Sequence, residues 1–93
     1  MRRYEWAVSK AAKNVKKHGV TFEDAAMACN DPLALTAADR IERGELRWRT
    51  VGFADRLLLF VAHTVEECGN IEVWRIISAR KATGKERRDY ENG

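Results

Sequence analysis

The sequence predicts a small α+β domain, with helices segregated from an antiparallel sheet of about four strands. Helix-spaced apolar residues occupy the first third of the chain, and strand-like segments follow from Leu33 to Ala79. A helix-opening motif then stands near the C-terminus. The 93 residues are expected to form one domain, 1–93, because so short a chain has too little volume for two cores.

The first third of the chain predicts a short β-like start at Tyr4–Trp6 and then two helices. From Ala7 to Lys17 the spacing i, i+3, i+4, i+7 indicates an amphipathic helix, which Gly19 ends. Thr21 caps the second helix, and Asn30-Asp31-Pro32 stops it. The two apolar stripes are Val8, Ala11, Ala12 and Val15, and Phe22, Ala25, Ala26 and Cys29.

The middle of the chain predicts the strands of the sheet. Leu33–Thr36 is a short strand candidate, and the polar segment Ala37–Gly44 is expected to be a loop. Leu46–Phe53 alternates in polarity, whereas Leu57–Val65 is mostly apolar on both sides, as a central strand is. Ile71–Ala79 is the last strand. Short connections between these last three segments predict an antiparallel meander.

The C-terminal residues predict a third helix. Thr83-Gly84-Lys85-Glu86 fits the capping box T-x-x-E, in which the Thr and Glu side chains each bond a backbone N–H of the first turn. The helix is expected to run to about Glu91. The predicted order of elements is therefore β-α-α-β-β-β-β-α.

The net charge of +3 hides an uneven distribution. Residues 1–20 carry six Lys or Arg against one acid, a charge of +5. Residues 21–70 carry five against nine, or −4, and residues 71–93 carry six against four, or +2. If the basic ends meet, they form a positive face that attracts phosphate, and the acidic middle is expected to face away. The alternative is that these cations are simply solvated helix surface.

Several function classes are disfavoured. The longest apolar run, Leu57–Ala62, is too short to cross a bilayer, and no signal peptide is evident. Cys29 and Cys68 lack CxxC spacing and are expected to be reduced thiols in a cytoplasmic protein, not a bridge or zinc ligands. The two histidines stand apart from any acid cluster, so we expect no metal site and no cofactor.

Basic and polar residues gather at the ends of the predicted elements. Such a set suits RNA cleavage by the RNA's own 2′-OH, which needs cations on the phosphoryl oxygens and groups that move protons. The candidates at element ends are Lys17, His18, Arg47, Arg49, His63, Arg75, Arg80, Lys81, Arg87, Arg88 and Tyr90. Trp48 and Trp74 could stack unpaired bases if exposed.

Each candidate also has a purely structural interpretation. His63 lies in an apolar strand and would be a hydrogen-bonded core residue, whereas His18 would favour the dipole at a helix C-terminus. Arg47 and Arg49 would line a solvated strand face. Glu86 would cap its own helix. Arg80 would pair with a nearby acid, and the tryptophans would be core or interface residues.

Motifs along nearly the whole chain, from about residue 4 to residue 91, resemble those of the BrnT toxins. Their ordered combination is specific, although no single motif is. The N-terminal motifs are Tyr4-Glu5-Trp6, Lys10, Asn14, Lys17-His18-Gly19-Val20 and Phe22, followed by Asp31-Pro32-Leu33-Ala34-Leu35. The later ones are Arg47-Trp48-Arg49-Thr50-Val51-Gly52, Val61-Ala62-His63-Thr64, Arg75-Ile76-Ile77-Ser78-Ala79-Arg80, Ala82, Glu86-Arg87 and Tyr90.

The resemblance implies the toxin of a type II toxin–antitoxin pair with a RelE-like fold. Such a toxin is a ribonuclease that blocks translation and is neutralised by BrnA, a ribbon-helix-helix antitoxin, so DNA would be bound only through the complex. Arg80 and Arg49 would then stabilise the phosphate and transition state, and His63 or His18 would transfer protons. Glu86 and Tyr90 would shape the site. The expected RNA-binding residues are Lys10, Lys17, Arg47, Arg75 and Lys81.

One departure from the family pattern supports a rival function. The family usually has an acid directly after the Trp of its opening motif, where this chain has Ala7. Loss of that acid removes a favourable charge at a helix N-terminus. The second hypothesis is therefore a catalytically weak or inactive relative that binds an antitoxin as a co-repressor. A third is a plain nucleic-acid binder, whose binding would depend steeply on salt.

Overall fold

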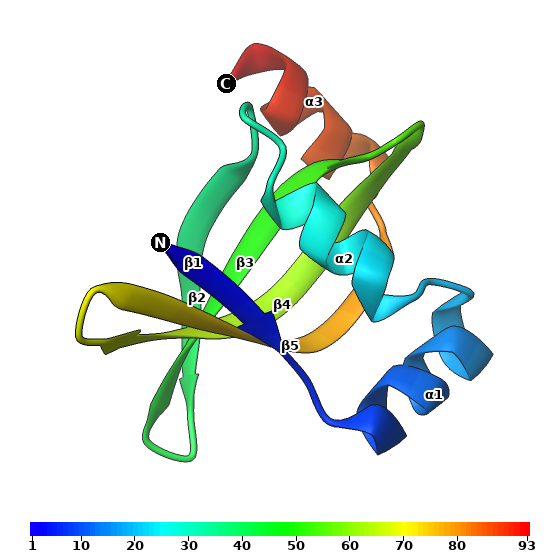
Figure 1. Cartoon of the computed structure of the whole chain (residues 1–93). Helices are drawn as coiled ribbons and strands as arrows, with labels where there is room; N and C mark the ends of the chain where they lie inside the picture. The colour runs from blue at the N-terminus through cyan, green and yellow to red at the C-terminus, as the bar shows by residue number, and fades with distance from the viewer.

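The computed structural model describes all 93 residues and confirms the predicted order of elements (Figure 1). The α+β class and the three helices are as predicted. The elements are β1 (Arg2–Glu5), α1 (Val8–His18), α2 (Phe22–Cys29), β2 (Leu35–Glu42), β3 (Glu45–Ala54), β4 (Leu57–Cys68), β5 (Ile71–Lys81) and α3 (Gly84–Asn92). No helix combines the length and the apolar composition that a membrane crossing requires.

The sheet has five strands in the order β1-β5-β4-β3-β2, so the prediction of about four antiparallel strands was incomplete. Strands β2 to β5 pair antiparallel, and for β3 to β5 this is the predicted meander. β1 instead pairs parallel with β5, from Arg2 opposite Glu72 to Glu5 opposite Arg75, and makes the sheet mixed. The likeness to the RelE fold stays a prediction.

The loop predicted at Ala37–Gly44 was wrong, because β2 continues to Glu42. β2 is an edge strand, and most of its residues are exposed. A strand in that position carries polar side chains on both faces, so its sequence lacks the alternation that identifies a half-buried strand. An irregularity between Ala38 and Arg40 interrupts its pairing with β3 and obscures the pattern further.

The core lies between α2 and one face of the sheet. Phe22, Ala25 and Ala28 of α2 are fully buried against strand residues such as Leu59. Gly52 on β3 permits this close packing, because a Cβ there would collide with the carbonyl oxygen of Ala28. Thr21 caps α2 by accepting from the backbone N–H of Asp24, as predicted. Cys29 and Cys68 are both free thiols.

The side of α1 that faces the core is not the side that carries its apolar stripe. Val8 is 82% exposed and Val15 is 45% exposed, whereas Asn14 is buried at 6%. The side chain of Asn14 donates to the carbonyl oxygens of Val20 and Ala79, both at 2.9 Å, and accepts from the N–H of Ala79 at 3.0 Å. These three bonds tie α1 to β5 and to the start of α2.

His63 lies in the core with 0% exposure, as its structural interpretation predicted. Its ring stacks on Trp74, with centroids 4.2 Å apart. Nδ1 lies 3.3 Å from the carbonyl oxygen of Thr64, so Nδ1 carries the hydrogen and Nε2 accepts from the Thr50 hydroxyl at 2.7 Å. Burial lowers the pKa of His63 to about 4, and the folded protein therefore holds a neutral ring.

We expect Asn14→Ala to lower the free energy of unfolding by about 3 kcal/mol, since three buried hydrogen bonds are lost and their partners stay buried. Alanine is the better helix former, so a loss cannot come from helix propensity. Urea unfolding measures it, with Lys13→Ala on the exposed side of the helix as the control. A loss below about 1 kcal/mol would show that Asn14 does not fix the helix.

We expect His63 to make the protein acid-sensitive. The unfolded chain protonates His63 near its ordinary pKa of 6.5 and the folded chain only near 4, so stability is complete above pH 6.5 and falls toward pH 4. The loss amounts to about 3 kcal/mol, at ~1.4 kcal/mol for each pKa unit. Urea unfolding at several pH values should show a flatter profile for His63→Gln over this window. Parallel profiles would contradict the assignment.

Candidate functional site

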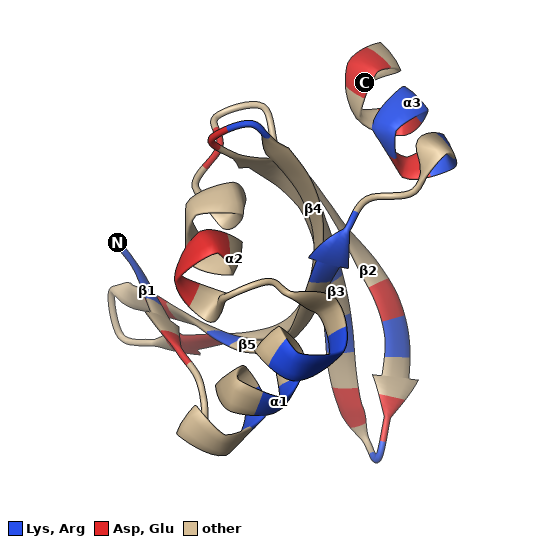
Figure 2. Ribbon diagram, turned by 90° about the vertical axis from the view of Figure 1, so that its right-hand side faces the viewer, with Lys and Arg blue, Asp and Glu red and all other residues tan.

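Four predicted arginines lie on one face of the sheet. Cross-strand pairing puts Arg49 beside Ala62 and Arg80 beside Phe60, and Arg75 is paired with Thr64. Paired residues share a face, and Arg47 lies two residues before Arg49, so all four point away from α2. We call this surface the open face and define it by Arg47, Arg49, Phe60, Arg75 and Arg80. Figure 2 shows α2 on the other side of the sheet and α3 beyond its end, and α1 packs beside β5.

Each arginine of the open face pairs with an acid. Arg49 lies 3.5 Å from Asp39, and Arg75 lies 3.5 Å from Glu5. Arg47 lies between Glu42 and Glu45, at 3.6 and 3.8 Å. The expectation that the acidic middle faces away from the arginines was therefore wrong, and acidic and basic residues alternate along β2 in Figure 2. A phosphate would have to exchange with these carboxylates.

Arg80 has the most closely bound partner. Its two terminal nitrogens donate to the two carboxylate oxygens of Glu86 at 2.8 and 2.9 Å, a bidentate geometry. Glu86 also accepts from the N–H of Thr83, which completes the predicted capping box. The bond from Arg80 lowers the pKa of Glu86, and the bond to Glu86 raises the pKa of Arg80. Both groups are therefore charged at neutral pH.

Arg80 keeps donors for a ligand. Two of its five N–H groups bind Glu86 and a third binds the carbonyl of Lys81, which leaves two. Its guanidinium lies over the ring of Phe60, 4.1 Å from the ring centre. Sequence reasoning missed Phe60, although the expected cross-strand pairing could have placed it beside Arg80. These contacts hold Arg80 in one orientation.

Two grooves mark the open face. The smaller, about 260 Å³, has Phe60 and Val51 in its lining and Arg49 and Glu86 among its polar groups. The larger, about 780 Å³, brings Lys10 of α1 together with Arg47 and Arg75. The two basic ends of the chain were expected to meet. This is confirmed in part, because α1, from residues 1–20, packs beside β5, from residues 71–93.

The remaining predicted cations, Lys17, His18 and Lys81, lie outside the open face as defined above. Lys17 and Lys81 are exposed, and His18 is half-buried at the end of α1. Asn14 binds both Val20 and Ala79, so the end of α1 lies beside the C-terminal end of β5. The ion pairs of the structure involve arginines or Lys85, and none includes a lysine of α1 or Lys81.

Tyr90 does not join the other candidates. Its hydroxyl donates to Asp31 at 2.6 Å, and its ring packs edge-on against Phe53. The bond to Asp31 raises the pKa of Tyr90 to about 12. Burial opposes the charge of Asp31, but hydrogen bonds from Phe53, Tyr90 and Leu33 together hold the pKa of its carboxyl below the ordinary value. Tyr90 therefore attaches α3 to the loop after α2.

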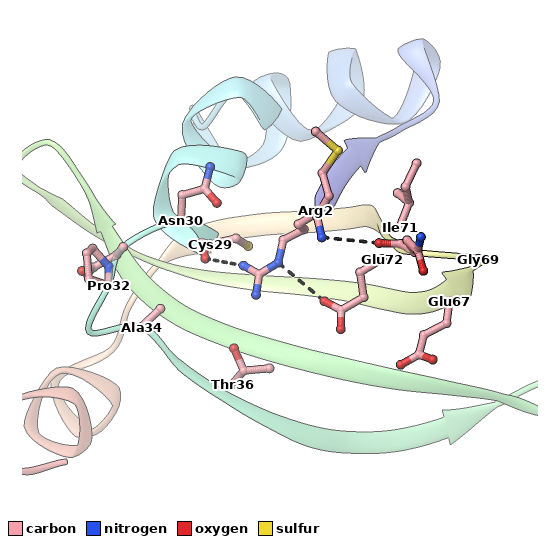
Figure 3. Close-up of a pocket in the computed structure, with 13 residues that line it drawn as sticks. Arg2, Cys29, Asn30, Pro32, Ala34, Thr36, Glu67, Gly69, Ile71 and Glu72 are labelled. Carbon is pink, nitrogen blue, oxygen red and sulfur yellow. Dashed lines mark hydrogen bonds and ion pairs between the residues drawn. The ribbon is translucent and has the colours of Figure 1, made fainter.

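A separate pocket of about 720 Å³ lies on the α2 side of the sheet (Figure 3). Arg2 extends into it, donates to the carbonyl of Cys29 at 3.0 Å, and lies 3.7 Å from Glu72. Its guanidinium stacks on Trp74, 3.8 Å from the ring centre. None of the predicted site residues lines this pocket. No cluster of three or more His, Cys, Asp or Glu side chains could hold a metal ion.

The fold and the open face define a class, a small α+β protein with an arginine-bearing sheet surface. Residues 6–86 match the family model of BrnT, the ribonuclease toxin of type II toxin–antitoxin systems, and the chain belongs to that family. The resemblance is thereby confirmed, and with it an antitoxin partner and an RNA target. A comparison with curated proteins found no match.

We expect the bidentate pair of hydrogen bonds between Arg80 and Glu86 to hold α3 against the sheet. In a double-mutant cycle of Arg80→Met and Glu86→Gln, urea unfolding should give a coupling energy of about 1–2 kcal/mol, since both hydrogen bonds are charge-assisted. The matched control is Lys85 and Asp89, an exposed pair in the same helix, which should couple by less than about 0.5 kcal/mol. Equal couplings would contradict a special role for Arg80.

Proposed function

We propose that this ribonuclease toxin is a metal-independent endoribonuclease that uses its open face to cleave RNA and so blocks translation. The observation that carries the proposal is that Arg49 and Glu86 line one groove and that Arg80 binds this same Glu86, with Lys10 and Arg75 in the larger groove. Fixed guanidinium groups can supply the charge that a metal ion supplies elsewhere. Membership of a ribonuclease toxin family supports the same reaction class.

In the proposed reaction the 2′-oxygen of the RNA attacks the adjacent phosphorus, and the bond from phosphorus to the 5′-oxygen breaks. The 2′-hydroxyl gives up its proton, and the leaving 5′-oxygen takes one, which yields a cyclic phosphate and a free 5′-hydroxyl. Arg80 would donate its two free N–H groups to the phosphoryl oxygens as negative charge develops there. Arg49, whose ion pair with Asp39 is 3.5 Å long and half-exposed, would exchange that acid for the phosphate.

Proton transfer falls to His18 in this proposal. His63 is buried and held neutral by its environment, so it cannot contact a bound strand in the folded protein. His18 is half-buried one turn after Asn14, which binds Ala79, the residue before Arg80. Lys17 next to it would hold the RNA backbone, with Arg47 and Lys81 as further contacts. Glu86 and Tyr90 shape the site by fixing Arg80 and α3.

The partner in this proposal is a BrnA-like antitoxin of the ribbon-helix-helix class, and the toxin would reach DNA only through the complex. The support is the family alone, since type II systems pair a toxin with a protein antitoxin. An antitoxin that covers the open face or the lysines of α1 would prevent RNA binding, because the domain is only about 30 Å across.

A second candidate function is an antitoxin-binding co-repressor with little catalytic activity. One observation favours it. Ala7 is the N-cap of α1, makes no side-chain cap bond, and is followed by no acid in the first turn. The helix that carries Lys10 and Lys17 therefore lacks the usual stabilisation of its N-terminus. RNA cleavage separates the two functions, because both require antitoxin binding.

The proposal predicts that the purified protein cleaves single-stranded RNA in EDTA and leaves cyclic-phosphate ends. Arg49→Ala and Arg80→Ala should each slow cleavage by about 10²–10³-fold, the usual cost of removing one transition-state donor. Arg56→Ala, an exposed arginine in the turn after β3, is the matched control and should stay within about twofold. Expression of the wild type should arrest bacterial growth and protein synthesis, and expression of the two slow variants should not.

Three results would contradict the proposal. Full activity of Arg49→Ala would exclude the open face, and this variant loses only an exposed ion pair, so it should fold normally. Cleavage that stops in EDTA and returns with Mg²⁺ would exclude the metal-independent mechanism. No cleavage by a folded wild type that still binds antitoxin would favour the co-repressor.

A further inference from the structure

The exposed side of α1 carries an apolar stripe that nothing in the chain covers. Val8 is 82% exposed and Val15 is 45% exposed, and Ala12 between them is also exposed. These residues lie four and seven positions apart and therefore share one side of the helix. The buried side is formed instead by Asn14, with Ala11 and His18 half-buried beside it. The most apolar side chains of α1 thus point into solvent.

The lysines of α1 surround this stripe, and no acid of the helix balances them. Helix α1 contains four lysines and a histidine and no acid. Lys16 lies four residues after Ala12, so it borders the stripe directly. No lysine of α1 forms an ion pair, in contrast to the arginines of the open face. A complementary surface would therefore combine apolar side chains with carboxylates.

We infer that the surface formed by Val8, Ala12, Val15 and Lys16 is the docking site of the antitoxin, through an amphipathic segment with apolar residues flanked by acids. The inference rests on the proposed function for the identity of the partner. It adds where that partner binds and which chemistry recognises it. A helix that lays its apolar side on exposed valines is an established mode of peptide recognition.

Two other occupants fit less well. A second copy of the chain would bring two sets of four lysines together without any acid from α1 to balance them. RNA would gain from the lysines but nothing from the valines, because phosphates and sugars bind polar donors. An acidic, apolar protein segment satisfies both features at once. It would also compete with RNA for the cations of α1.

The test uses the full-length toxin and its purified cognate antitoxin. The double variant Val8→Glu with Val15→Glu should weaken binding at least tenfold by titration calorimetry, because it replaces apolar contacts with charges that repel an acidic segment. Glutamate forms helices better than valine, so the variant should fold. Lys16→Ala should weaken binding less and reduce its dependence on salt. Ile41→Glu, at a residue 72% exposed on β2, is the matched control and should bind within twofold.

The outcomes distinguish this inference from the proposed function. At saturating RNA, the free double variant should cleave RNA at the rate of the wild type, since neither valine belongs to the open face, whereas the two added carboxylates beside the lysines of α1 should raise its KM for RNA. Unchanged antitoxin affinity of the double variant would overturn the docking site, whatever the ribonuclease assay shows. Loss of cleavage with intact antitoxin binding would assign the stripe to RNA. If the double variant binds antitoxin more weakly but the wild type cleaves no RNA, the docking site is supported and only the proposed ribonuclease activity is contradicted.

Discussion

The side-chain amide of Asn14 fixes how the first helix sits on the sheet. β1 covers the edge of β5 only as far as Arg75, so the following residues would otherwise present an unpaired strand edge. Asn14 accepts from the N–H of Ala79 and donates to its carbonyl, as a neighbouring strand would, and it also binds Val20. Because leaving such groups buried and unpaired is costly, α1 can neither slide along β5 nor rotate on it. The positions of the α1 lysines relative to Arg75 and Arg80 follow from this contact.

The open face combines fixed and exchangeable cations. Arg49 and Arg75 hold acids through exposed ion pairs, which contribute about 0–1 kcal/mol and can exchange with a phosphate. Arg80 is different, because a bidentate bond to Glu86 and the ring of Phe60 fix its guanidinium while two N–H groups stay free. Preorganised donors cost no reorganisation when charge develops on a ligand. The small net charge is therefore compatible with strong local recognition of phosphate.

Local chemistry made much of this fold predictable, and long-range contacts account for what the sequence did not reveal. The capping box from Thr83 to Glu86 and the continuous apolar run of β4 are encoded by neighbouring residues, and both were correctly predicted. The rotation of α1 was not, because three hydrogen bonds of a single polar residue outweigh the burial of Val8 and Val15. The parallel pairing of β1 joins residues about 70 positions apart, a contact with no local signature. For the site, sequence placed Arg49 and Arg80 on strands but could not show their acidic partners.

The valine side of α1 lies close enough to Lys17 for a partner bound at the valines to affect RNA binding at that lysine. A helix with its side chains is about 10 Å across, and the Debye length at physiological ionic strength is about 8 Å. Carboxylates seated beside Val15 and Lys16 would therefore lower the positive potential at Lys17 without contacting it. RNA depends on that potential, because each neutralised phosphate releases counterions that drive binding. An antitoxin on the valine side could thus weaken RNA binding while the open face stays uncovered, and inhibition would require no change in the conformation of Arg80.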